Sequence, residues 1–325
     1  MKKYICRRLL MMIPVLLGIS FVVFGLLELS PGDPAQVILG QRATPESIAQ
    51  LREEMGLNAP FLVRYVKYIA GVLTGNFGVS YRTKLPVMQE ILMRLPTTLI
   101  IASGSMVMMV ILALPIGILS AVKQYSILDN VTLAGALLLS SMPGFWLGTI
   151  MILLFALKLG WLPAKGGGSF SGYLMPWFAL AASYMATLVR LTRSNMLEVI
   201  RADYIKMARA KGASERQVIV RHALRNACLP IVTIIGMNFA KLIGGTMIIE
   251  SVFALSGLGT LAVTAVTQLD IPMVMAEVLF ISFIIGVMNL IVDILYVYID
   301  PRLKSQYVTV SRKKRLEKAG LGAKS

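Results

Sequence analysis

The chain has 325 residues, of which 57% are hydrophobic and 15% charged, and its mean hydropathy is +0.75. Soluble globular domains are about 45–50% apolar and about 25% charged, so this composition excludes an ordinary soluble fold and a disordered chain. The formal net charge of +16 would suit a nucleic-acid-binding protein, but the basic residues stand between apolar runs and form no RNA-binding motif. We therefore expect an integral membrane protein that binds the lipid bilayer and no nucleic acid.

A basic N-terminus leads directly into the first apolar run, Leu9–Leu29. The apolar part of a secretory signal peptide has roughly 7–15 residues, whereas a spanning helix needs about 20. The length of this run favours an uncleaved first transmembrane helix, and we assign residues 1–29 to a cytoplasmic N-terminus and that helix.

About six apolar runs are long enough to span a bilayer. Their residues are Leu9–Leu29, Thr97–Val122, Val131–Leu159, Leu174–Leu191, Pro230–Ile249 and Ala276–Tyr298. The runs lack the alternation of a barrel strand, and a spanning segment must pair its own backbone groups. The sequence predicts an all-α membrane protein with a core over residues 97–300.

Lysine and arginine concentrate on one side of the predicted spans. They occur before the first helix, between the fourth and fifth helices, and in the basic tail, residues 301–325. Because such residues are enriched in cytoplasmic loops, we expect a multi-pass protein of the cytoplasmic (inner) membrane with both termini and the tail in the cytoplasm.

Residues 30–96 would then lie outside the cytoplasm. Thr44-Pro45-Glu46 is typical of a helix start, with proline in the first turn and an acid near the positive end of the helix dipole. A second amphipathic stretch covers Phe61–Leu73. We expect a small folded extracytoplasmic element here.

The connection at residues 198–229 is basic and predicts two short helices. Gly212 ends the first helix, as glycine does at a helix C-terminus. Ser214 and Gln217 have the spacing of a capping box that starts the second, and Pro230 marks entry to the fifth span. A basic loop alone would only set topology, but two helices around a tight turn make a rigid surface on which a partner can act.

These residues carry a family resemblance. D-Y-I-K-M-A-R-A-K-G at 203–212 and H-A-L-R-N-A-C-L-P at 222–230 resemble the coupling loop of ABC-importer permeases, most of all those for dipeptides, oligopeptides and nickel. Similar stretches follow in the family's order at 31–34, 56–60, 77–81, 94–99, 141–146, 161–163, 257–259 and 289–293. The chain departs from the family at Asp203, where the general motif opens with Glu-Ala-Ala, and at Leu255-Ser256, where Trp-Pro is frequent.

The resemblance implies a type I ABC-importer permease fold and a pore-forming subunit. It implies three kinds of partner: a second homologous permease, two cytoplasmic ATPases, and an extracytoplasmic substrate-binding protein. ATP and Mg would be bound by the ATPases, because this sequence contains no G-x-x-x-x-G-K-[ST] motif. The residues it assigns to ATPase coupling are Asp203, Ala208, Ala210, Gly212, Ser214, Arg221 and Pro230.

Ionisable residues inside spans are candidates for a translocation pathway. They are Lys241, Glu250 and Asp293, and Lys241 is placed to pair with Asp293. Glu250 and Glu277 stand near outer helix ends, where an interfacial position is the simpler interpretation.

Several alternatives remain open from the sequence. Import of nickel or a metal chelate would use the same machinery as peptide import. An ion-coupled secondary transporter or channel could use Asp293 and Lys241, but it would not need a rigid docking loop. A membrane scaffold is a third possibility. We expect no catalytic or metal site, because the one histidine, His222, lies in the loop and H-E-x-x-H is absent.

Overall fold

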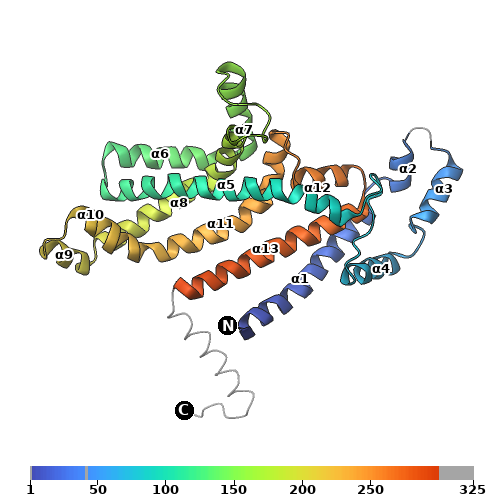
Figure 1. Cartoon of the computed structure of the whole chain (residues 1–325), viewed down its shortest axis with the longest axis horizontal. Helices are drawn as coiled ribbons and strands as arrows, with labels where there is room; N and C mark the ends of the chain where they lie inside the picture. Colours follow the sequence, from blue (N-terminus) through green and yellow to red (C-terminus); the bar gives the residue numbers. More distant parts are fainter. Residues whose placement is uncertain (1, 41–42, 300–325) are drawn as a thin grey trace, which may run out of the picture. The chain divides into compact units, whose positions relative to one another are not determined.

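The computed structural model describes residues 2–40 and 43–299, so the predicted tail at 301–325 lies outside the described residues. Every regular element in the described part is helical, and one isolated bridge joins Val79 and Pro86. Figure 1 shows the elements in order. They are α1 Lys2–Leu29, α2 Pro34–Leu39, α3 Pro45–Glu54, α4 Phe61–Leu73, α5 Val87–Val122, α6 Ile127–Ser141, α7 Gly144–Met151, η2 Ile152–Lys158, α8 Phe170–Ile200, α9 Asp203–Ala210, α10 Glu215–Gln217, η3 Val218–Ala223, α11 Leu224–Val252, α12 Leu258–Thr267 and α13 Ile271–Ile299, where η marks a π-helix.

Among the described residues, five helices are long and apolar enough to cross a membrane, and a bent pair makes six. The prediction of an all-α protein with about six spans is therefore confirmed. The third predicted span, Val131–Leu159, is not one helix: α6 and the α7–η2 segment meet at a bend of 103°. Pro143 lies at this bend and accounts for it. Proline has no N–H for the hydrogen bond of a continuous helix, and it disfavours helical geometry at the preceding residue, Met142.

Two other helices differ from their predicted bounds. α5 begins at Val87, so the expected boundary between residues 96 and 97 falls inside a helix. Val87 and Ile91 are fully buried, and this burial extends the helix beyond its continuous apolar run. The fifth span begins at Pro230, as predicted, but its helix, α11, begins earlier at Leu224 and follows η3 without a break, so Pro230 lies inside that helix. Membrane helices tolerate interior proline because neighbouring groups pair the freed carbonyl.

The chain divides into two compact units. Among the described residues, unit 1 contains those up to Met109, Leu139–Tyr184 and Phe239–Gly286, and unit 2 contains Val110–Leu138, Met185–Asn238 and those from Val287 onward. A core of unit 1 gathers buried apolar side chains from the starts of α5 and α13 and from α12. Its buried members are Val87, Ile91, Leu258, Leu261, Ala265, Met273, Val274 and Ala276.

The segment after α1 is folded, as predicted. Thr44 caps α3 and exchanges hydrogen bonds with Ser47, while Pro45 occupies the first turn. α4 has the predicted bounds and contacts α1, where the Tyr65 hydroxyl lies 2.9 Å from that of Ser20. Arg64 of α4 forms an ion pair with Glu28 near the end of α1.

Candidate functional site

The helix turn at Gly212 in unit 2 has the geometry of a Schellman motif. The Gly212 N–H donates to the Arg209 carbonyl at 2.9 Å, and the Ala213 N–H donates to the Ala208 carbonyl at 3.2 Å. Gly212 has φ +83°, which favours glycine, and a Cβ there would have no atom within 4 Å. Backbone conformation, not crowding, therefore requires glycine at this position.

The second loop helix begins with the predicted capping box. The Gln217 N–H donates to Ser214 Oγ at 3.4 Å, and the Ser214 N–H donates to Gln217 Oε1 at 3.3 Å. Arg209 bridges the turn, with Nε 2.7 Å from Glu215 Oε1. Hydrogen bonds from Arg209 lower the pKa of the exposed Glu215 carboxyl. The turn is thus fixed by backbone, cap and ion pair together.

α9 and η3 pack together and leave a mixed outer surface. Ile205, Val218 and Ala223 are fully buried. The opposite side of α9 exposes Tyr204 and Met207 by 47% and 60%. Figure 1 shows α9 and α10 together at the end of the yellow loop segment. This exposed apolar surface beside basic residues is suited to contact another protein.

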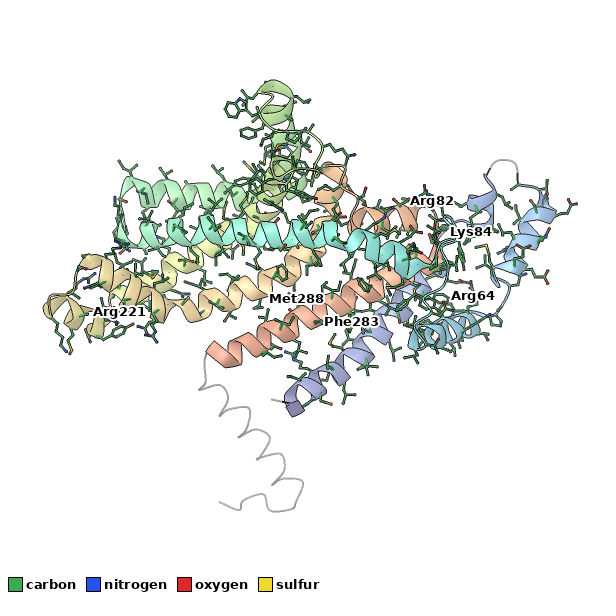
Figure 2. All side chains as sticks on the ribbon, in the orientation of Figure 1. Arg64, Arg82, Lys84, Arg221, Phe283 and Met288 are labelled. Carbon is green, nitrogen blue, oxygen red and sulfur yellow. The ribbon has the colours of Figure 1, made fainter. Side chains whose placement is uncertain are left out.

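The structure places the remaining loop residues on this same unit. Asp203 begins α9 and pairs with Lys206 at 2.8 Å, and hydrogen bonding from Lys206 lowers its pKa. Ala208 and Ala210 lie in the last turn of α9. Arg221 is exposed on η3 and is labelled in Figure 2. Pro230 lies inside α11, beyond the helix pair.

A buried ion pair supports the base of the loop, and sequence reasoning missed it. Asp129 is 1% exposed and receives two hydrogen bonds from Arg193 of α8, at 2.6 and 2.7 Å. Ser120 and the Tyr125 N–H also donate to this carboxylate. Nearby, Arg201 donates to Gln124 at 3.1 Å. These contacts tie the α5–α6 turn to α8, the helix that leads into α9. The sequence signal that could have indicated this turn is the capping pattern Ser126-x-x-Asp129.

Glu250 in unit 1 is fully buried and caps α12. Its Oε2 accepts the Thr260 N–H at 3.0 Å, and its Oε1 accepts the Thr98 hydroxyl at 2.6 Å. Thr98 in turn accepts the Leu258 N–H at 2.8 Å. Gly257, the N-cap residue, has no side chain, so Glu250 supplies the missing acceptor. This geometry supports a structural role for Glu250, and its role in a translocation pathway stays a prediction.

The other intramembrane candidates are not brought together within one unit. Lys241 is exposed on α11 and belongs to unit 1, whereas Asp293 is half-buried on α13 and belongs to unit 2, so their pairing stays a prediction. Glu277 is 1% exposed, so it is buried within the protein, and its interfacial position in the membrane stays a prediction. Neither carboxyl oxygen has a hydrogen-bond partner within the described residues. Those residues also contain no group of three or more potential metal-binding side chains.

Comparisons with known proteins agree with this geometry. Residues 113–305 match the family described as binding-protein-dependent transport system inner membrane component, and residues 1–102 match its N-terminal region. In the solved structures, a chain of the MetNI methionine ABC transporter, in an inward-facing conformation, matches with a TM-score of 0.56. It is 18% identical and covers 66% of this chain and 98% of that one, which identifies a type I ABC-importer permease fold.

Three curated relatives align along almost their whole length. A dipeptide transport system permease protein from Alkalihalophilus pseudofirmus is 39% identical over 94% of this chain and 100% of the relative. A glutathione transport system permease protein from Salmonella typhimurium is 40% identical over 94% and 99%. An oligopeptide transport system permease protein from Bacillus subtilis is 38% identical over 94% and 100%.

The cap at α12 yields a prediction that separates the two roles of Glu250. Glu250→Ala leaves the Thr260 N–H and Thr98 hydroxyl without acceptors, so we expect a loss of about 3 kcal/mol and a lower melting temperature of the detergent-solubilised protein. Ser251→Ala, at an exposed neighbour bonded only to its own helix, should change little. Normal melting of the Glu250 variant with loss of transport would contradict the cap and favour a pathway role.

Proposed function

Because the chain belongs to the family of binding-protein-dependent transport system inner membrane components, and is the membrane-spanning permease subunit of an ABC importer, we propose that it carries dipeptides or oligopeptides across the inner membrane. The dipeptide and oligopeptide systems of the relatives support this substrate class. Glutathione, named for a third relative, is itself a small peptide. Nickel or a metal chelate is the alternative within the same machinery.

The proposed assembly contains this chain, a second homologous permease, two cytoplasmic ATPases that bind ATP and Mg, and an extracytoplasmic substrate-binding protein. Both termini would be cytoplasmic, as the lysine and arginine bias indicates. Residues 30–96 would then lie on the side from which substrate arrives. Family membership favours ATP-driven import over an ion-coupled transporter, channel or scaffold.

The observation that carries the coupling role is the fixed turn at Gly212. The Schellman hydrogen bonds, the capping box and the Arg209–Glu215 pair hold α9 as a rigid body. Its exposed Tyr204 and Met207 offer apolar area for an ATPase surface. Closure of the ATP sites would then move α9 and, through Asp129 and Arg193, the helices of unit 2. Lys241 and Asp293 remain proposed pathway residues.

Substrate class can be tested directly. We expect ATP-dependent uptake of a radiolabelled dipeptide by cells expressing the complete transporter, and loss of that uptake when this chain alone is deleted. Binding of dipeptides by the associated binding protein should be tighter than binding of Ni²⁺. Tight Ni²⁺ binding, with nickel uptake that depends on this chain, would favour the alternative substrate.

The turn at Gly212 can be tested with two substitutions. Gly212→Val places a β-branched residue at φ +83°, which it adopts poorly, whereas asparagine tolerates this conformation better. We expect the ratio of substrate transported to ATP hydrolysed to fall about tenfold or more in the valine variant, which corresponds to about 1.4 kcal/mol of coupling. The asparagine variant should keep most of the wild-type ratio. Equal transport and normal ATPase association in both variants would refute the coupling role.

A further inference from the structure

The connection between α4 and α5 contains a tight loop at residues 78–87, which we call the basic loop. The Ser80 N–H donates to the Leu85 carbonyl at 3.0 Å, and the Val87 N–H donates to the Gly78 carbonyl at 3.1 Å. Thr83 donates to Glu90 of α5 and accepts the Leu85 N–H at 3.3 Å. The loop is therefore closed on itself and fastened to the first turn of α5.

One buried carboxylate fixes the base of this loop. Asp270 is 3% exposed, accepts the Ser80 hydroxyl and accepts the Tyr81 N–H at 3.1 Å. The same carboxylate caps α13 by accepting the Met273 N–H at 3.4 Å. Burial, with a smaller contribution from the charge of Asp270, raises the pKa of Tyr81 to about 12, so its phenol stays neutral. The loop is thus continuous with the starts of α5 and α13.

The tip of the loop presents charge and apolar surface outward. Arg82 and Lys84 are exposed, and neither forms an ion pair in the described part of the chain; both are labelled in Figure 2. Val79 and Leu85 are 49% and 44% exposed beside them. Lys84 has φ +59°, a conformation that is uncommon for lysine and is maintained by the surrounding hydrogen bonds.

We propose that the basic loop is a docking site for an acidic surface of the extracytoplasmic substrate-binding protein, with Arg82 and Lys84 as the contacting charges. The inference rests on the proposed function, which places this loop outside the cytoplasm. Arg82 and Lys84 are exposed on an ordered loop and form no ion pair within the described residues, so both charges are available to an acidic partner. Arginine together with apolar area is the composition of a protein interface, and a rigid loop loses little entropy when a partner binds.

Anionic lipid headgroups are the competing occupant. Long mobile basic side chains bind lipid headgroups well, and such binding requires no fixed backbone. The backbone of the basic loop, by contrast, is fixed by Asp270 and by hydrogen bonds across the loop. The attachment to α5 and α13 also means that a protein docked on the loop acts directly on the starts of two spanning helices. The fixed backbone of the basic loop therefore favours a protein partner.

The test uses the complete transporter in lipid nanodiscs and a peptide-loaded binding protein as the probe. ATPase stimulation is measured as a function of binding-protein concentration for wild type and for Arg82→Glu/Lys84→Glu. We expect the half-maximal concentration to rise about tenfold or more while the maximum is kept, because rim charges act mainly on encounter. Added salt should raise the half-maximal binding-protein concentration of the wild-type transporter and have little effect on that of the variant.

Lys67→Glu is the matched control, since Lys67 is an exposed cation of α4 in the same segment, and it should titrate as wild type. Identical titrations of wild type and the Arg82/Lys84 variant would overturn the docking site alone. An effect that disappears when anionic lipid is omitted would overturn it in favour of headgroups. A wild-type complex that no peptide-loaded binding protein stimulates would overturn the proposed function and this inference with it.

Discussion

A helix that begins in an apolar environment leaves backbone N–H groups that lipid cannot pair, and each unpaired group costs several kcal/mol. Two buried carboxylates pair such N–H groups at helix starts, and a third pairs the N–H of a turn. Asp129 holds the α5–α6 turn, Glu250 caps α12, and Asp270 caps α13. Each also binds a distant segment: Arg193, Thr98 and Ser80, respectively. These carboxylates therefore hold together segments of each unit that are far apart in the sequence.

Features that depend on local chemistry could be predicted from the sequence. Apolar run length identified the spans, Thr44-Pro45 the start of α3, and Gly212 with Ser214 the helix pair of the loop. What escaped prediction depends on contacts between residues far apart in the chain. Thr98 and Glu250 are 152 residues apart, and Ser80 and Asp270 are 190 apart. No local pattern reveals such pairs, and the early start of α5 follows from the tertiary burial of Val87.

The two units contain different kinds of ordered surface. Unit 2 carries the α9 helix, exposed and fixed at its end by the Gly212 turn. Unit 1 carries the basic loop, fixed by Asp270 at the starts of α5 and α13. In the proposed assembly, this subunit would receive work from one partner and substrate from another. The proposed roles assign one ordered surface to each partner, and both are connected to spanning helices through buried carboxylates.

Contact between α9 and an ATPase is the central claim, and site-specific crosslinking tests it most directly. Cys6 and Cys228 are first replaced by serine, and Met207→Cys, at a 60% exposed position of α9, is then crosslinked in the assembled transporter. The account predicts a crosslink to the ATPase whose yield changes between nucleotide-free and ATP-bound states, and none from Val263→Cys, which is exposed on α12. Equal crosslinking from both positions, or none from α9, would contradict it.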